Sequence, residues 1–287
     1  MKKNQVLERV IHGIFLLLGL ITVGCVLLIT VYLVISGIPA IREIGLAGFL
    51  FGKEWASTAS EPKYGILPFI LTSVYGTFGA IVIGVPIGLL CAIFLAKMAH
   101  GKLAKTVRSA VDLLSGIPSV VYGLVGMILI VPAVREIFGL PDGANLFSAI
   151  LVLTIMILPS VISVSETAIR AVPREYEEAS LALGATKTET VFKVVVPAAK
   201  SGILASVVLG IGRAIGEAMA VMMVSGNVAN MPKLFGSVRF LTTAVASEMS
   251  YSSGLQREAL FSIALVLFVF ILAINLVLNL VVKKEKR

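Results

Sequence analysis

Two ionisable residues of opposite charge lie inside an apolar stretch of this sequence. Arg213 and Glu217 are the charged residues of segment 201–224, whose other side chains are apolar or small and polar. On one continuous helix, a spacing of four would place both side chains on one face, where they could meet. Charged side chains inside a membrane are costly and usually face a bundle interior or water. The pair could fix helix packing or line a substrate path, and the default role of such residues favours the path.

An anion would suit this pair chemically. The guanidinium of Arg213 presents its donors as a fork that matches the oxygens of phosphate. Glu217 would weaken the hold on the anion and supply a counter-charge when the path is empty. Gly210, Gly212 and Gly216 would allow a neighbouring backbone to approach closely. The pattern predicts an anion path along this segment.

A charged segment, residues 170–200, is longer than a connection between two helices requires. Pro173 suits the first turn of a helix, and the glutamates that follow it would stabilise the positive end of the helix dipole. Gly184 is a typical residue just beyond a helix end. These signals predict a helix over residues 174–183.

A second short helix is predicted directly after the first. Thr186 and Glu189 form a capping-box pattern, and the helix is expected to end before Pro197. The two helices could lie on lipid or dock to another protein. Helices that lie on lipid usually carry a polar face rich in Lys and Arg, so the glutamate-rich start favours a protein partner.

The composition requires lipid around these segments. Of the 287 residues, 58% are hydrophobic and 14% are charged, whereas soluble domains are near half apolar and a quarter charged. A transmembrane helix needs about 20 mainly apolar residues. The sequence therefore predicts an all-α integral membrane protein with a six-helix polytopic bundle. The predicted spans are residues 13–40, 64–96, 113–134, 143–165, 201–224 and 259–282.

The distribution of Lys and Arg predicts the orientation of the chain. These residues are more frequent on the side of the N-terminus than on the opposite side, so both termini are expected in the cytoplasm. The net charge of +8 comes from residues at the ends of apolar runs, a pattern that does not indicate nucleic-acid binding. Cys25 and Cys91 lie in apolar runs and show no metal-ligand spacing, so no metal site is predicted.

Two loops on the predicted external side, residues 41–63 and 225–258, are long. Their aromatic residues, such as Trp55 and Tyr251, could simply sit at the membrane interface. Loops of this length are also often functional, so docking of an external partner is an equal alternative.

The segment around residue 180 resembles a known motif. Glu178, Ala179 and Ser180, with Gly184 and Pro197 at the matching distances, resemble the EAA loop of ATP-binding-cassette (ABC) importer permeases. Ser180 stands where that family usually has a second alanine. The resemblance implies the type I ABC importer permease fold, in which this cytoplasmic loop is the coupling helix that sits in a cleft of an ATPase subunit.

A second match narrows the family. Residues 212–221, followed by Gly226 and Asn227, resemble the permeases of phosphate-specific ABC importers, and residues 51–55 and 64–68 resemble their PstC type. The resemblance implies a substrate path that includes Asn227 beside Arg213 and Glu217. It also implies three parts of the chain: an N-terminal helix and external loop over 1–66, a transmembrane domain over 67–282, and a basic tail over 283–287.

The resemblance also implies partners and a location. These are a second permease subunit of the PstA type, two ATP-binding subunits of the PstB type and an external phosphate-binding protein of the PstS type. The expected location is a bacterial plasma membrane. No cofactor is expected on this chain, which has no G-x-x-x-x-G-K-[ST] motif, so ATP would be hydrolysed by the partner.

Two other functions are weaker. An ion-coupled secondary anion transporter usually has internal repeats and more carboxylates near the membrane centre. An intramembrane enzyme is a third alternative, but the sequence has no H-E-x-x-H motif, and its two histidines, His12 and His100, lie at membrane edges and suggest no Ser–His pairing. The chain is therefore expected to be a non-catalytic permease subunit.

Overall fold

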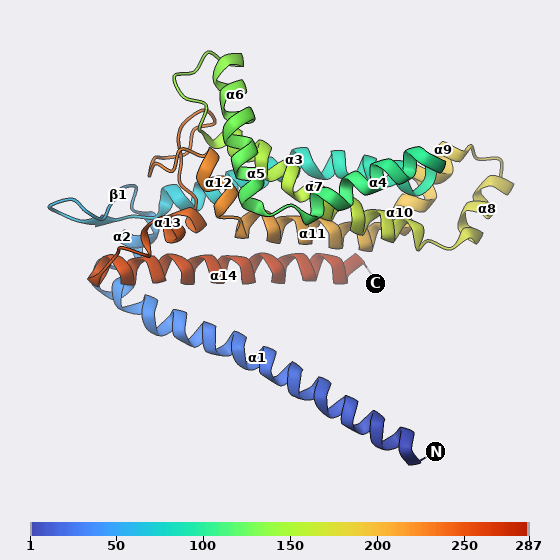
Figure 1. The fold of residues 1–287 in the computed structure, drawn as a ribbon, viewed down its shortest axis with the longest axis horizontal. Coiled ribbons are helices and arrows are strands. Elements are labelled where there is room, and N and C mark those ends of the chain that lie inside the picture. Colours follow the sequence, from blue (N-terminus) through green and yellow to red (C-terminus); the bar gives the residue numbers. More distant parts are fainter. Residues whose placement is uncertain (1, 286–287) are drawn as a thin grey trace.

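The computed structural model describes residues 2–285. Long helices run along one direction and lie side by side (Figure 1). A small β-hairpin lies at one end of this bundle, called the hairpin end. The short helices α8 (Arg174–Ala182) and α9 (Lys187–Thr190) lie at the other end, called the α8 end.

Four of the predicted spans are long helices with few interruptions. Five described helices are long and apolar enough to cross a membrane, and six if one bent pair counts as a span. The four long spans are α1 (Lys2–Ile44), α3 (Leu67–Ile93, continued by the π-helical turn η1, Phe94–Met98), α7 (Leu146–Arg170) and α14 (Gly254–Glu285). α1 lies apart from the bundle along most of its length and meets α14 near the hairpin end (Figure 1).

The start of the third predicted span, residues 113–134, was wrong. α4 (Gly101–Gly116) ends before Pro118, and α5 (Ser119–Val125) begins after it. Pro118 has no N–H and disfavours helical backbone at Ile117, which is extended. The apolar span therefore starts at Ser119 and continues through η2 (Gly126–Ile130) and α6 (Val131–Ile137).

The fifth predicted span, residues 201–224, is broken. α11 (Lys200–Gly216) ends before Glu217, and a separate short helix, α12 (Met219–Val224), follows. Non-helical backbone at membrane depth is tolerated where it is buried in protein or lines a cavity.

The first short helix at the α8 end and the start of the second were predicted correctly. α8 (Arg174–Ala182) ends beside Gly184, and the capping box of Thr186 and Glu189 starts α9 (Lys187–Thr190). The expected end before Pro197 was wrong. The helix continues through η3 (Val191–Val195) and α10 (Val196–Ala198), where Pro197 occupies the first turn and needs no N–H partner. It then bends by 68° into α11.

The hairpin end is a compact set of short elements. α2 (Leu46–Phe51) is followed by β1 (Trp55–Ala56) and β2 (Lys63–Tyr64), which pair antiparallel. Trp55 is buried and packs edge-on against Tyr64 and beside Phe69. It is thus a core residue here, whereas Tyr251 is exposed. The loop 225–258 also contains the helix α13 (Leu241–Glu248), whose first half is buried.

The centre of the bundle is formed by α3 packed against α7. Small residues on α3 allow the close approach, because a Cβ on Gly84 would lie 2.8 Å from Ile157 Cδ1. α12 completes this core with the fully buried Ala220, Val221 and Val224.

Candidate translocation path and coupling surface

The break in the fifth span is centred on Glu217. Its backbone is extended, with φ −72° and ψ 130°, so α11 cannot continue through it. Its carboxylate accepts a hydrogen bond from the backbone N–H of Ala220 at 2.9 Å and so caps the start of α12. Its carbonyl accepts from the hydroxyl of Thr242, on α13, at 2.6 Å. The polar groups exposed by the break are thus partly satisfied by protein.

Arg213 lies in the last turn of α11 and does not pair with Glu217. Both residues are described, and no ion pair joins them; Arg213 Nη1 instead donates to the hydroxyl of Ser160, on α7, at 3.2 Å. The two side chains do not meet, because the helix ends between them. In the described part of the chain, the other N–H groups of this half-buried guanidinium make no hydrogen bond. Arg213 therefore keeps donors for a ligand.

An exposed strip runs beside Arg213 across the break. Leu209, Gly212, Gly216 and Met219 are all exposed, and a Cβ at either glycine would meet nothing within 4 Å. Gly210 faces the other way, where a Cβ would lie 3.2 Å from Val161. The strip therefore leaves room for another helix directly beside Arg213.

Asn227 lies beyond the far end of α12. It has a left-handed backbone, with φ 51°, and its carbonyl accepts from Arg239 Nε at 3.0 Å. Its side-chain oxygen is buried and makes no hydrogen bond within the described residues. The whole of α12 separates it from the break, so the structure links Asn227 to Arg239 rather than to Arg213.

The EAA-like residues divide into two groups. Glu178 and Ala179 are exposed on α8 and can meet a partner. Ser180 is instead turned toward α9, where its hydroxyl lies 2.9 Å from that of the buried Thr190. The hydroxyl that departs from the usual alanine thus ties the two short helices together.

Gly184 forms the turn between the two short helices. Its φ is +88°, a left-handed value that side chains other than glycine rarely adopt. Apolar side chains are exposed around it: Leu183 is 90% exposed, and Tyr176 and Leu181 also face outward. Pro197 is exposed at the start of α10. An exposed apolar surface in a charged segment indicates a protein interface.

The pKa of Glu189 is lowered to about 2. The main cause is the hydrogen bond from the backbone N–H of Thr186, followed by that from Lys193. The capping box is therefore held by an ionised carboxylate.

An anchor joins α8 to the membrane helices. Glu177 pairs with Lys97 of η1, and both side chains are largely buried. This contact was not predicted, because the two residues are 80 positions apart in the sequence.

Sequence reasoning also missed a buried carboxylate near the α8 end. Glu166 of α7 is 8% exposed and pairs with Arg108 of α4 and, at 2.8 Å, with Nε of Arg170. We call these three residues the Glu166 cluster. The predicted span ended at residue 165, so Glu166 was overlooked, although its spacing of four from Arg170 was a usable signal.

A second, largely buried carboxylate lies at the hairpin end. Glu248 pairs with Arg239 and accepts hydrogen bonds from Trp55 Nε1 at 3.3 Å, from the hydroxyl of Ser57 at 3.3 Å and from the amide of Gln256 at 3.0 Å. We call these five residues the Glu248 cluster. Trp55 and Glu248 are 193 positions apart, so no local pattern could have indicated the cluster.

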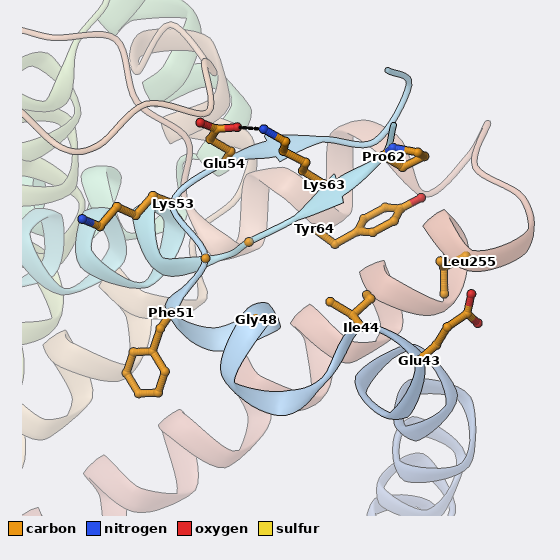
Figure 2. Close-up of a pocket in the computed structure, with 12 residues that line it drawn as sticks. Glu43, Ile44, Gly48, Phe51, Lys53, Glu54, Pro62, Lys63, Tyr64 and Leu255 are labelled. Carbon is orange, nitrogen blue, oxygen red and sulfur yellow. Dashed lines mark hydrogen bonds and ion pairs between the residues drawn. The ribbon is translucent and has the colours of Figure 1, made fainter. Parts of the chain in front are cut away.

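An open hollow of about 700 Å³ lies beside the hairpin (Figure 2). Lys63 and Glu54 pair at 2.5 Å on its rim, and this contact lowers the pKa of Glu54. Burial, with a smaller effect of Glu43, raises the pKa of Tyr64. The charges around the hollow include both signs, so it is not a clear anion site.

Comparison with known proteins agrees with this architecture. Residues 84–287 match the family model described as binding-protein-dependent transport system inner membrane component. The chain is 38% identical to the probable ABC transporter permease protein YqgH of Bacillus subtilis, over 90% of this chain and 86% of that protein. It is 33% identical to the phosphate transport system permease protein PstC of Haemophilus influenzae, over 96% and 92% of the two chains.

A solved structure shares the fold. A chain of a bacterial alginate ABC transporter, solved with an alginate-bound periplasmic protein, superposes with a TM-score of 0.59 at 16% identity, over 94% of both chains. The predicted ABC importer permease fold is therefore confirmed. The family match extends over more than half of the chain, and the protein belongs to the binding-protein-dependent transport system inner membrane components.

Proposed function

We propose that this protein is the membrane-spanning permease subunit of an ATP-driven phosphate importer. The observation that carries the proposal is Arg213, a half-buried guanidinium that lies beside a helix break and makes one hydrogen bond within the described residues. Discontinuous helices form the substrate sites of many transporters. The likeness to phosphate transport permeases supports phosphate as the substrate.

The path would run along the exposed strip of α11 and α12. A second permease subunit, of the PstA type, would face this strip, and phosphate would pass between the two subunits. The carboxylate of Glu217 is held at the start of α12, so Arg213 can meet the anion with its charge largely uncompensated. Asn227 would act at the external approach to the path, through its unpaired side-chain oxygen or its link to Arg239.

ATP would act through a separate subunit. Glu178, Ala179 and the exposed apolar residues of α8 form a surface that suits a cleft in an ATP-binding subunit of the PstB type. Gly184 sets the turn of that surface, and Pro197 starts the helix that leads back to the bundle. An external phosphate-binding protein of the PstS type would deliver phosphate at the hairpin end. We therefore expect α8 and both termini in the cytoplasm, and a reporter fused after Arg287 should report a cytoplasmic location.

The test is phosphate uptake by Arg213→Gln, measured per assembled complex in liposomes with ATP inside. Loss of a charged hydrogen bond of about 1.5–3 kcal/mol would reduce uptake about 10- to 150-fold. Arg135→Gln, an exposed arginine on α6, is the matched control and should transport normally. Normal uptake by Arg213→Gln would contradict the proposal. Uptake that needs an ion gradient but no ATP would support the secondary transporter instead.

A further inference from the structure

A series of polar contacts leads from α8 into the bundle. Glu177 of α8 pairs with Lys97 of η1. Two residues before Lys97, the carbonyl of Leu95 accepts a hydrogen bond from Arg170 Nη2 at 2.5 Å. Arg170 is also held by Glu166, so α8 is connected through η1 to the Glu166 cluster.

The Glu166 cluster then reaches α4. Arg108 of α4 pairs with the same carboxylate oxygen that binds Arg170. A hollow of about 330 Å³ lies between these helices and is lined by Arg108, Asp112, Glu166 and Arg170, among others. The apolar group that packs α4 here is small: Leu95, Val111 and Ile162 are buried, and Cys91, Ala99, Val107 and Leu158 are partly buried around them. Charge contacts therefore add to the apolar attachment of α4 to α7.

From α4, contacts continue to the break in the fifth span. The hydroxyl of Tyr122, on α5, donates to the carbonyl of Leu114, on α4, at 2.5 Å and ties the two segments together across Pro118. α5 packs closely on α12, because a Cβ on Gly123 would lie 2.8 Å from Cα of Ala220. Ala220 is the residue whose N–H is capped by Glu217.

We propose that Glu166 is a positioning residue that transmits movement of α8 to α4, and through α5 and α12 to the break beside Arg213. This inference rests on the proposed function. Glu166 holds two arginines that would repel each other without it. Its charge therefore keeps α4 joined to α7, the helix whose Arg170 contacts η1 and so follows α8. The half-exposed arginines and the adjacent hollow allow the joint to move without breaking a packed core.

The experiment uses Glu166→Gln in the complete complex with its ATPase and binding protein, in liposomes. Phosphate imported per ATP hydrolysed should fall about tenfold, within the usual range of coupling between two sites, while ATP hydrolysis continues. Arg108→Gln should have the same effect, and its half-exposed position makes it the safer variant for folding. Asp112→Asn is the matched control, since this exposed carboxylate lines the same hollow but forms no ion pair within the described residues.

A second measurement, hydrogen exchange, tests the inference without measuring phosphate transport. In the wild-type complex, ATP should change the hydrogen exchange of both α8 and α4; in Glu166→Gln, α8 should still respond and α4 should not. A wild-type ratio of phosphate to ATP in both variants, or an α4 response that persists, would overturn the inference. Parallel loss of uptake, hydrolysis and assembled complex would show a merely structural role and also overturn it. If the wild type imports no phosphate while the α4 response depends on Glu166, the proposed function fails and the inference stands.

Discussion

Two largely buried carboxylates at opposite ends of the bundle hold their arginines in different ways. Glu248 accepts from four side chains, and its partner Arg239 is 17% exposed. The cluster lies against a large apolar core that joins α1, the hairpin, α3, α13 and α14. Around Glu166, the two arginines are 50% and 48% exposed and border a hollow.

This difference indicates which end of the bundle can move. A carboxylate with several partly buried partners in packed surroundings has one arrangement, and losing a partner is costly. A carboxylate with half-exposed partners beside a hollow can change its geometry at lower cost. We therefore interpret the Glu248 cluster as a fixed clamp on the helices of the hairpin end and the Glu166 cluster as a movable joint.

The largest expected effect tests the clamp. Glu248→Ala leaves Arg239 largely buried without its partner and should destabilise the protein by about 3–5 kcal/mol. The thermal midpoint and the yield of folded protein in detergent are the measurements. Glu136→Ala, an exposed carboxylate on α6, is the control and should be neutral. If Glu248→Ala is as stable as the control, the clamp does not exist.

The next prediction concerns the turn at the α8 end. Gly184→Val must adopt a left-handed backbone, which costs about 1–2 kcal/mol for a residue with a Cβ. We expect phosphate uptake to fall while membrane insertion and total protein stay normal, because the site is exposed and far from the core. Gly139→Val, on an exposed turn after α6 that also has positive φ, is the matched control and should keep uptake. Normal uptake by Gly184→Val would argue against a coupling role for this turn.

A smaller effect is expected from the capping box. Thr186→Ala should cost about 0.5–2 kcal/mol of local helix stability, seen as faster hydrogen exchange over residues 187–199. Thr188→Ala, an exposed threonine in the same helix, should change exchange much less. Equal exchange in the two variants would show that the cap is not needed.

The same capping box has a defined pH dependence. The pKa of Glu189 is lowered, so its contribution is fully present above the ordinary value near 4.5 and is lost as the pH falls toward about 2. Titration of a carbon-13 label on the Glu189 carboxyl should give a midpoint well below 4. A midpoint at 4.5 would show that the carboxylate is not engaged.

The smallest effect is expected between Arg213 and Glu217. Because the helix break separates them, a double-mutant cycle with Arg213→Met and Glu217→Met should give a stability coupling near zero, within about 0.5 kcal/mol. A coupling of several kcal/mol would mean that the pair is a packing device after all. In that case a fixed ion pair would lie between the two ends of the bundle, and the contrast between them would weaken.

Much of the architecture could be predicted from the sequence, because it is encoded in local patterns. Long apolar runs predicted the helices α1, α3, α7 and α14 nearly in place. The turn at Gly184 and the capping box at Thr186 were predicted because a helix end is decided by residues three or four positions away. The family resemblance was carried by the same local segments.

Only the tertiary structure decided the arrangement of the charges. The break at Glu217 follows no proline; its carbonyl is satisfied by Thr242, which is 25 positions away, and a local pattern cannot supply that partner. Arg213 turned to Ser160 for the same reason. Arg108, which pairs with Glu166, and Trp55, which donates to Glu248, also come from distant segments. A helix makes its backbone hydrogen bonds within one segment, so local sequence patterns can predict it. A charged side chain inside a membrane needs a partner from another segment, and which partner lies close enough depends on how the whole chain packs.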